Sequence, residues 1–512
     1  MIEGYSLAFS YIAAQPTVLL FMLAGLFIGL VIGALPGITG PAGIAIMIPF
    51  TFVMRPVDAI VMLAALYIGS LFGGAITAIL FNTPGSPEAA CTSLDGYPLA
   101  KKGLAGKALG VAVGVSSLGA TLAAVVLALL APPLANFALR FGPTEYFALA
   151  FFGLSVITSI DSKSYWKSLS AGLIGLLLAT VGFDPLSSAA RNTFGTIALM
   201  GGIGFMPIII GIFAIAEVFT RARHKTLGVM EVDGKATTVS VELPTLKEWL
   251  SLKVTFARSF LIGVIIGVLP GIGATTAAFV SYSEEVRWSK NPSLYGTGVM
   301  NGVAAPETAN SVAATVSMVP LLSLGLPGSA ATAVMIGGFL IHGIVPGPLM
   351  MVQQKELVYT IFVTMFLASI VMLFMGIMMT RFFGYALKVK YTIMAPIISV
   401  LCFIGVFSIN NSIFDVRLVF FVATIGYFFR KFDYPLAPLI IGIVLGRIAE
   451  ENLRRGLSIF NEDLVAMFVV RPITAVLMVL GIVSLIYGLY NNFKKMMRTK
   501  KEEAEASGKA AS

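Results

Sequence analysis

Long apolar runs without charged residues alternate with short polar segments along most of the chain. Ala59–Phe81 and Leu357–Thr380, for example, contain no Asp, Glu, Lys or Arg, and a helix needs roughly 20 such residues to cross a bilayer. The runs lack the polar/apolar alternation of membrane barrel strands, and backbone polar groups in lipid must be satisfied within a helix. The pattern predicts an all-α polytopic membrane protein with about 10–14 membrane segments. The other expected spans are Gln15–Leu35, Lys107–Ala131, Glu145–Ile160, Ser168–Phe183, Phe194–Phe219, Ser251–Leu269, Tyr391–Ile409, Leu418–Phe429, Tyr434–Arg447 and Pro472–Tyr490, with broken or re-entrant segments around Gly40–Met54 and Thr275–Tyr282.

The sequence Leu-Pro-Gly-Ile interrupts two of these runs, at Leu35–Ile38 and Leu269–Ile272, with an offset of 269 − 35 = 234. A second pair follows, Thr83–Ser86 (Thr-Pro-Gly-Ser) and Leu326–Ser329 (Leu-Pro-Gly-Ser), with an offset of 327 − 84 = 243. Paired Pro/Gly interruptions in corresponding positions of two halves indicate the binding site of a secondary transporter. Solenoid and propeller repeats have periods of only about 20–50 residues, so a single duplication explains the pattern better.

The composition agrees with membrane insertion. Of the 512 residues, 57% are hydrophobic and 12% charged, and the mean hydropathy is +0.93, whereas soluble chains carry about 25% charged residues. The net charge of +9 does not indicate nucleic-acid binding, because the basic residues cluster between apolar runs and in the C-terminal tail, as topology determinants do. Two isolated cysteines, Cys91 and Cys402, indicate neither a disulfide framework nor a metal site. The N-terminus lacks the basic region of a cleaved signal peptide.

The distribution of basic residues predicts the orientation in the membrane. Lys and Arg are enriched in cytoplasmic loops, which places the N-terminus outside and the C-terminus in the cytoplasm. The spans before the two Leu-Pro-Gly-Ile sequences then enter the membrane from opposite sides, so the duplicated units form two inverted-topology repeats. The predicted domains are an N-terminal repeat half (1–219), a cytoplasmic connecting loop (220–250), a C-terminal repeat half (251–493) and a basic cytoplasmic tail (494–512).

The interruptions have a chemistry suited to binding ions and substrate. Proline and glycine unwind a helix, and unwound backbone is tolerated in a membrane where it is buried in protein or lines a cavity. Half-helix starts attract anions, and half-helix ends attract cations. The alternative is a set of structural kinks, because Gly and Pro are common in membrane helices, but four interruptions in matched order favour function. We expect substrate binding by Asn82, Thr83, Pro84, Gly85, Ser86, Pro327, Gly328 and Ser329, and a cation-binding or hinge role for Pro36, Gly37, Thr39, Gly40, Pro270, Gly271, Gly273, Thr275 and Thr276.

A segment rich in small residues, Asn301–Ser317, is the second candidate. Small residues let helices approach closely, and polar residues inside a membrane usually face a partner or a cavity. We therefore expect Glu307, Asn310 and Ser311 beside a cation site, with Glu307 able to carry a proton if burial favours its neutral form. The alternative is a solvated Glu307 in an interfacial loop. Through the offset of 243, Asn310 aligns with Tyr67 of the first half.

The rest of the sequence contains fewer indications of a binding or catalytic site. No Lys or Arg lies within the four interruptions, so an anionic substrate would be held by helix N-termini, hydroxyls and co-bound cations, which favours sodium coupling. The chain lacks a phosphate-binding loop and an H-E-x-x-H motif, and we expect no cofactor or metal besides sodium. Five carboxylates near predicted span ends are expected to be solvated: Asp58, Glu88, Asp95, Glu145 and Asp184. His342, which lies in an apolar stretch, is expected to be packed or interfacial.

Four stretches, Ala34–Phe52, Phe81–Gly103, Gly302–Ala314 and Val319–Pro348, together resemble the large membrane subunit of the tripartite tricarboxylate transporters, the TctA family. The resemblance implies a bacterial inner-membrane permease for tri- or dicarboxylates. It also implies a periplasmic substrate-binding protein, a small membrane subunit, energy from an ion gradient that is usually sodium, and an elevator-like movement of one helix bundle against a scaffold.

We therefore predict secondary active, cation-coupled uptake of carboxylates, and not an enzyme. Three other functions fit parts of the pattern. A stand-alone proton-coupled organic-anion permease would use Glu307 as its proton carrier. An intramembrane enzyme would need a convergent catalytic pair, which the sequence does not offer. A passive channel would not accumulate substrate above equilibrium.

Overall fold

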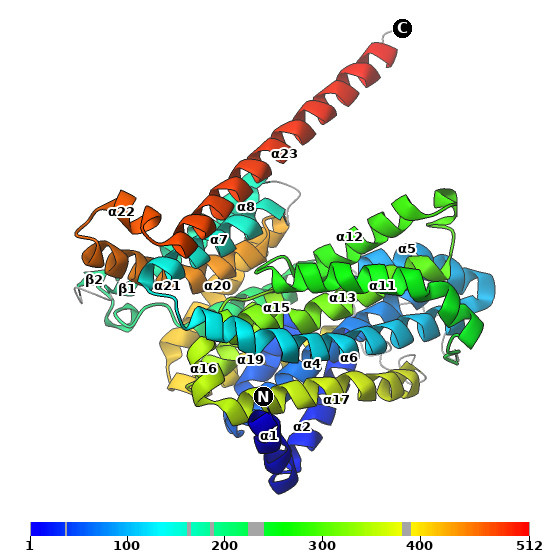
Figure 1. The fold of residues 1–512 in the computed structure, drawn as a ribbon, viewed down its shortest axis with the longest axis horizontal. Coiled ribbons are helices and arrows are strands. Elements are labelled where there is room, and N and C mark those ends of the chain that lie inside the picture. The colour runs from blue at the N-terminus through cyan, green and yellow to red at the C-terminus, as the bar shows by residue number, and fades with distance from the viewer. Residues whose placement is uncertain are drawn as a thin grey trace. The chain divides into compact units, whose positions relative to one another are not determined.

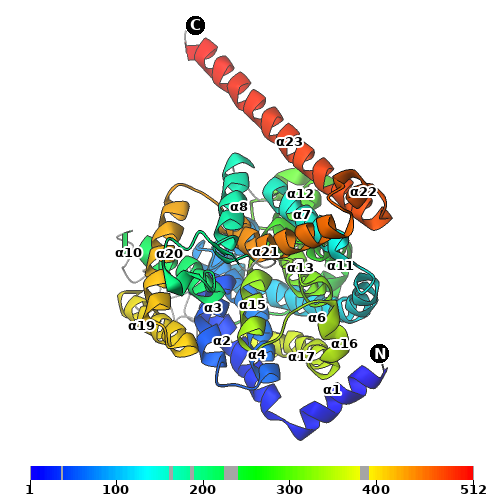
Figure 2. The same cartoon turned by 90° about the vertical axis from the view of Figure 1, so that its left-hand side faces the viewer.

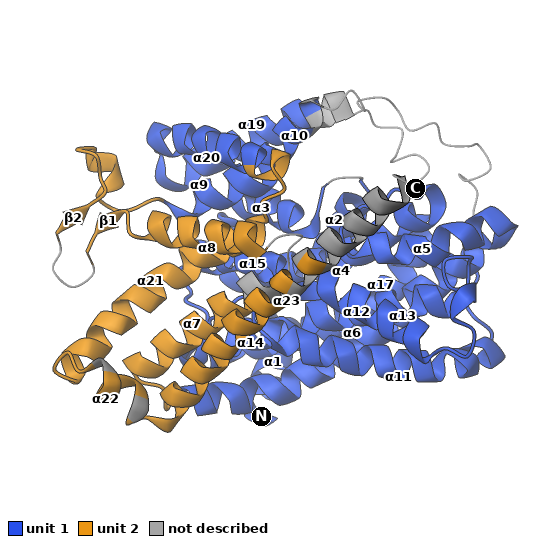
Figure 3. Cartoon of the chain, turned by 90° about the horizontal axis from the view of Figure 1, so that it is seen from above, with its two compact units in different colours: residues 1–139, 204–428 blue, residues 140–203, 429–512 orange. Residues whose placement is uncertain are grey.

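The computed structural model describes residues 2–35, 38–160, 165–184, 189–223, 240–380 and 391–510. The chain forms two compact units, coloured separately in Figure 3. Unit 1 comprises residues 1–139 and 204–428, and unit 2 comprises residues 140–203 and 429–512. Both units take segments from both predicted repeat halves, so the compact units are not the repeats themselves. The division into repeat halves stays a prediction.

Unit 1 contains the helices that flank all four interruptions (Figures 1 and 2). They are α1 (Ile2–Ala14), α2 (Thr17–Ala34), α3 (Gly40–Thr51), α4 (Pro56–Phe81), α5 (Ala89–Leu99), α6 (Ala105–Ala138), α9 (Phe205–Ile209), α10 (Ala216–Arg223), α11 (Leu246–Val268), α12 (Gly273–Trp288), α13 (Met300–Val316), α14 (Met318–Leu324), α15 (Ala330–Ile341), α16 (Pro348–Gln353), α17 (Lys355–Thr380), α19 (Tyr391–Asn410) and most of α20 (Ile413–Lys431). Short π-helical turns at Ala100–Leu104 and Ile210–Ile215 join α5 to α6 and α9 to α10.

Unit 2 is built from α7 (Pro143–Ile160), α8 (Tyr165–Ala179), α21 (Leu436–Ile459), α22 (Leu464–Val469) and α23 (Pro472–Ala510), with an antiparallel pair of two-residue strands, β1 (Gly182–Phe183) and β2 (Ala190–Arg191). Helix α21 packs against α7 and α8. A 3-10 turn at Ile197–Leu199 and irregular backbone precede α9. The expected span Phe194–Phe219 is therefore wrong in its first third, because helix begins only at Phe205.

Among the residues that the structure describes, six helical stretches are long and apolar enough to cross a membrane: Thr17–Ala34, Pro56–Phe81, Ala89–Ala138, Leu246–Val268, Lys355–Thr380 and Pro472–Tyr490. These six lie where the sequence predicts spans, and the fold is an all-α multi-pass membrane protein. The helices that follow the first and last interruptions, α3 and α15, are different. Each has 12 residues, about 18 Å of helix, which is shorter than the roughly 30 Å hydrocarbon core.

Helices α2 and α4 approach each other at glycines. Gly29 and Gly33 of α2 face the carbonyl oxygens of Leu66 and Ser70 on α4, and a Cβ atom on either glycine would overlap these oxygens. Small residues that let backbones touch are typical of membrane helix interfaces. The pair therefore packs backbone against backbone along the whole length of α2.

Helices α11 and α13 repeat this packing. Gly263 and Gly267 of α11 face α13. A Cβ atom on Gly263 would lie 2.9 Å from the carbonyl oxygen of Ala309, and a Cβ atom on Gly267 would lie 2.9 Å from the carbonyl oxygen of Ala313. The glycines follow those of α2 by 234 residues, and the carbonyls follow those of α4 by 243. The two offsets found from the sequence thus recur in the contacts, so the duplication extends to the packing. The opposite orientation of the two copies in the membrane stays a prediction.

Candidate functional site

We number the four interruptions in chain order as breaks 1 to 4: Leu35–Ile38, Thr83–Ser86, Leu269–Ile272 and Leu326–Ser329. In break 1, Pro36 and Gly37 lie outside the described residues. Thr39 caps the start of α3, because its hydroxyl accepts a 3.4 Å hydrogen bond from the backbone N–H three residues later. Gly40 lies against α4, where a Cβ would stand 3.6 Å from the ring of Tyr67.

Break 2 ends α4 and turns back along α2. Asn82 takes the left-handed conformation, with φ of 51°, and closes the helix. The Thr83 hydroxyl donates to the carbonyl of Phe81 at 3.1 Å. Gly85 touches the carbonyl of Gly33, so breaks 1 and 2 lie side by side. Asn82 is exposed, Thr83 and Pro84 are half-buried, and Gly85 and Ser86 are buried.

Break 3 is a tight turn between α11 and α12. Pro270 and Gly271 form this turn, and both Gly271 and Gly273 have positive φ, at 81° and 78°, which glycine adopts without strain. Gly273 faces break 4, since a Cβ there would stand 3.6 Å from Cβ of Ser329. The Thr276 hydroxyl donates to the carbonyl of Ile272, the residue that precedes α12, at 3.2 Å. A ligand role for Thr276 stays a prediction.

Break 4 begins α15. Pro327, Gly328 and Ser329 are all buried, and Gly328 lies against the backbone and side chain of Ser317 at the end of α13. Ser329 and Thr332 form a reciprocal cap. The Ser329 hydroxyl accepts from the N–H of Thr332 at 3.2 Å, and the Thr332 hydroxyl accepts from the N–H of Ser329 at 2.8 Å.

Two side-chain hydrogen bonds connect breaks that belong to different halves. Tyr67, which lies against break 1, donates its hydroxyl to Oγ of Ser329 in break 4 at 3.3 Å. Thr275, three residues after break 3, donates to Oε2 of Glu88, two residues after break 2, at 3.2 Å. All four breaks therefore meet in one region of unit 1.

Glu307 lies inside the same unit and is completely buried. Its carboxylate accepts hydrogen bonds from Thr92 at 2.5 Å, Ser116 at 2.9 Å and Asn310 at 3.4 Å, and the Ser311 hydroxyl in turn donates to Asn310 at 2.9 Å. The solvated alternative for Glu307 is wrong, because α5, α6 and α13 enclose it. No Lys or Arg in the described chain forms an ion pair with Glu307. Keeping a buried carboxylate charged is costly when no cation stands beside it, and a proton or a bound cation would relieve this cost.

The expectation that the carboxylates near span ends are solvated is also wrong. Their exposed fractions are 2% for Asp58, 8% for Glu88, 0% for Asp95, 2% for Glu145 and 3% for Asp184. Hydropathy places these residues at the ends of apolar runs, but segments distant in sequence cover them in the fold. His342 is half-buried, and its Nε2 lies 3.4 Å from the Thr51 hydroxyl, as a packed histidine should.

Asp95 joins the two halves through a loop. One of its oxygens accepts the backbone N–H groups of Gly296, Gly298 and Val299 at 2.9, 2.8 and 3.1 Å, and the other accepts the hydroxyl of Tyr282 at 2.8 Å. Hydrogen bonds to an ionised carboxylate are about twice as strong as neutral ones. Asp95 of the first half therefore fixes the backbone that leads into α13 of the second.

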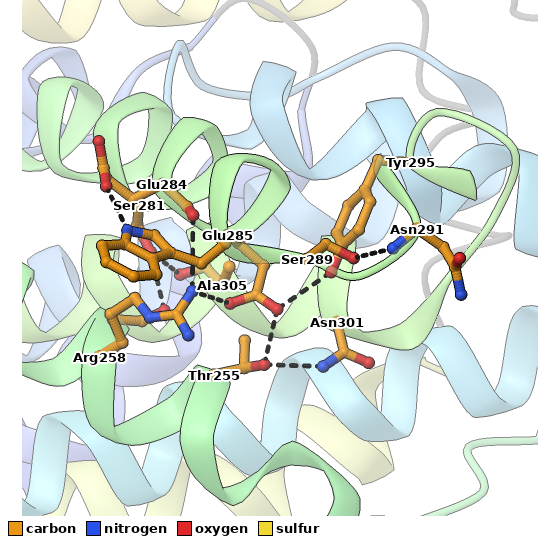
Figure 4. Close-up of polar contacts among 12 residues, drawn as sticks. Thr255, Arg258, Ser281, Glu284, Glu285, Ser289, Asn291, Tyr295, Asn301 and Ala305 are labelled. Atoms are coloured by element: carbon orange, nitrogen blue, oxygen red, sulfur yellow. Dashed lines mark hydrogen bonds and ion pairs between the residues drawn. The ribbon is translucent and has the colours of Figure 1, made fainter. Parts of the chain in front are cut away.

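A further polar cluster lies at the far end of α12 (Figure 4). The Glu285 carboxylate accepts from Thr255 at 2.9 Å, from Tyr295 at 3.0 Å and from Arg258 at 3.3 Å, and Asn301 donates to the Thr255 hydroxyl at 2.7 Å. Because Arg258 supplies a positive charge, Glu285 needs no further cation. This cluster ties α11, α12 and α13 together and is not a candidate binding site.

The sequence pattern of the Tripartite tricarboxylate transporter TctA family matches residues 19–441. The chain belongs to this family. A protein of Agrobacterium vitis, described as an uncharacterized 52.8 kDa protein in the TAR-I ttuC' 3' region, is 37% identical over 498 residues, which are 96% of each chain. A second Agrobacterium vitis protein, from the TAR-II ttuC' 3' region, is 38% identical over 227 residues, 44% of this chain and 93% of its own. No solved structure matches the chain.

Sequence reasoning missed several side chains at the site of this TctA-family protein. The sequence contained a feature that could have identified Tyr67, because this residue aligns with Asn310 through the repeat offset. Glu88 could also have been identified, because it lies two residues after break 2. No sequence feature could have identified Thr92 and Ser116, because they form hydrogen bonds to Glu307 across separations of 215 and 191 residues.

Proposed function

We propose that this TctA-family protein is a secondary active carrier that takes up tri- or dicarboxylates across the bacterial inner membrane together with a cation, with sodium as the coupling ion. The observation that supports the proposal most is the meeting of the four breaks in unit 1. The N-terminus would face the periplasm and the C-terminus the cytoplasm. A periplasmic binding protein would deliver the substrate, and a small membrane subunit would complete the transporter.

The carboxylate groups of the substrate would bind at the helix starts. The backbone N–H groups at a helix start carry a partial positive charge and bind anions. Helix α3 starts after Thr39, the residue that follows break 1, and α15 starts after Ser329, the last residue of break 4. The two helices also pack against each other. This pair supports binding of a substrate with more than one carboxylate, and the hydroxyls of the breaks would complete its hydrogen bonds.

The coupling cation would bind near Glu307. Its carboxylate has three neutral donors and no Lys or Arg partner among the described residues. Thr92 and Ser116 come from the first half and Glu307 from the second, so occupation of this site would hold the halves together. An elevator-like movement of the bundle that carries the breaks would then depend on the ion. This dependence would couple uptake to the sodium gradient.

Uptake of labelled citrate into proteoliposomes, reconstituted with the partner proteins, tests the proposal. An inward sodium gradient should drive accumulation above the external concentration, and Glu307→Gln should abolish it, while Glu356→Gln, at an exposed position of α17, should not. Equilibration without accumulation would indicate a channel and overturn the proposal. Loss of uptake in Glu307→Gln with no dependence on sodium would instead support the alternative, a proton-coupled permease.

A further inference from the structure

The two breaks that contain Pro-Gly-Ser use their serines differently. Ser329 and Ser86 are equivalent through the offset of 243. The hydroxyl of Ser329 is engaged twice, by the N–H of Thr332 and by the hydroxyl of Tyr67. The hydroxyl of Ser86 has no hydrogen-bond partner, although the residue is only 4% exposed. A buried hydroxyl without a hydrogen-bond partner costs about 1–3 kcal/mol. A ligand that binds the hydroxyl would offset this cost.

The free hydroxyl stands beside a buried carboxylate. Ser86 lies close enough to the carboxylate of Glu88 to stabilise its charge, although the two groups do not have the geometry of a formed hydrogen bond. Glu88 accepts a hydrogen bond from Thr275, and no Lys or Arg of the described residues forms an ion pair with it. The start of α12, which carries Thr275, offers only about half a positive charge. Glu88 therefore lacks the full counter-charge that a buried carboxylate needs.

We propose that Ser86, Glu88 and Thr275 bind a sodium ion, at a site additional to the one near Glu307. The site offers a carboxylate and two hydroxyls, and oxygen is the donor that hard cations prefer. The lone pairs of the Ser86 hydroxyl would coordinate the cation together with the Glu88 carboxylate, so one ion would satisfy both buried groups. The inference rests on the proposed function, because it gives the carrier a second coupling ion.

The position of the site gives this ion a role in the transport cycle. Glu88 belongs to the first half and Thr275 to the second, so a bound cation would bridge them. The reverse holds for Glu307, which belongs to the second half and is held by Thr92 and Ser116 of the first. Both sites thus bridge the same two halves of the chain. A cation at one site holds the halves in the arrangement that the other site needs, so sodium should bind cooperatively.

Sodium titration of the purified full-length protein, with choline chloride keeping the ionic strength constant, tests this site through the unfolding temperature. Sodium should raise the unfolding temperature of the wild type, with a Hill coefficient of about 2. In Ser86→Ala, the unfolding temperature without sodium should be unchanged or higher, because no hydrogen bond is lost and an unsatisfied buried hydroxyl is removed. The sodium concentration for the half-maximal rise should increase at least tenfold, and the Hill coefficient should fall to about 1. Glu88→Gln should show the same loss of sodium response.

Ser329→Ala is the matched control, since it changes the equivalent serine of the other half. It should lower the unfolding temperature in the absence of sodium, because a helix cap is lost, and leave the half-maximal sodium concentration unchanged. If Ser86→Ala and Glu88→Gln respond to sodium as the wild type does, the second site is overturned while sodium coupling stands. If sodium stabilises none of the proteins, the sodium coupling of the proposed function fails as well. If stabilisation follows pH instead of sodium and disappears in Glu88→Gln, the site binds a proton and the sodium assignment is wrong.

Discussion

The hydroxyl of Tyr67 donates a hydrogen bond of 3.3 Å to Oγ of Ser329, and these two residues come from different halves of the chain. Ser329 caps α15, which starts at break 4, and Tyr67 lies against break 1. The bond therefore connects the two helix starts that we assign to the substrate. Any movement of α15 relative to α4 must break it.

Removing this bond should weaken substrate binding more than folding. Tyr67→Phe should lower the free energy of unfolding by about 1 kcal/mol, the usual value of one hydrogen bond, because Thr332 still holds Ser329. The KM for the carboxylate should rise several-fold, since Ser329 loses its orientation. Initial uptake rates in proteoliposomes measure the effect, with Tyr487→Phe, a 61% exposed tyrosine, as control. Equal KM values for the two variants would contradict the role of Tyr67.

The glycine contacts between α2 and α4 should tolerate no side chain. Gly33→Ala places a Cβ onto the carbonyl oxygen of Ser70, and such overpacking costs about 1–3 kcal/mol. Gly201→Ala is the control, because a Cβ there meets no atom within 4 Å. Thermal unfolding in detergent should show a lower transition temperature for Gly33→Ala only. Equal transition temperatures would argue against the close packing of the two helices.

Asp95 should control the order of the loop between α12 and α13. Asp95→Ala leaves three backbone N–H groups and the Tyr282 hydroxyl without their acceptor, and we expect a loss of about 3 kcal/mol or more. Asp95→Asn keeps one oxygen and should lose less. Trypsin should cleave after the exposed Lys290 faster in Asp95→Ala than in Asp95→Asn or the wild type. Equal cleavage rates in all three would show that Asp95 does not hold the loop.

Two neighbouring arginines of α21 should contribute very differently to the stability of the protein. Arg454 binds Asp184, a 3% exposed carboxylate, at 2.6 Å and Glu450 at 3.0 Å, whereas Arg455 pairs with the half-exposed Glu451. Asp184 keeps a second partner in Arg191, at 3.3 Å, so the loss of Arg454 should cost less than the roughly 3–5 kcal/mol of a fully broken buried pair. A surface pair is worth about 1 kcal/mol or less. Arg454→Gln should therefore lower the unfolding temperature much more than Arg455→Gln. A similar small change in both would mean that Asp184 does not depend on Arg454.

Local patterns predicted the helices and the breaks because both arise from residues close in sequence. Pro270 and Gly271 end α11 through their own backbone properties, which do not depend on what surrounds the helix. The repeat offset correctly paired Gly33 with Gly267. Burial of Asp95 and Glu88 could not be predicted in this way. Each stands near the end of an apolar run, and only the covering segments, such as the loop at 296–299, show that it is enclosed.

The partners of Glu307 were unpredictable for the same reason. Asn310 lies one helical turn away and was expected, but Thr92 and Ser116 reach Glu307 through tertiary packing. The residues at 194–204 show another limit, since the predicted span Phe194–Phe219 begins there but the chain forms irregular backbone and a 3-10 turn at Ile197–Leu199. Hydrophobicity alone does not distinguish a helix from an apolar loop.

The central claim is that two copies of one helix unit, inserted in opposite directions, bring their breaks to a shared site. Ala14 and Lys247 test it directly, because each is exposed at the start of a helical segment that leads to a Leu-Pro-Gly-Ile break: Ala14 is the last residue of α1, just before α2, and Lys247 lies in the first turn of α11. The native cysteines are buried, so Ala14→Cys and Lys247→Cys can be labelled in intact cells with a membrane-impermeant maleimide. The account predicts that only Ala14→Cys reacts in intact cells and that Lys247→Cys reacts only after permeabilisation. Reaction of both from the same side would contradict it.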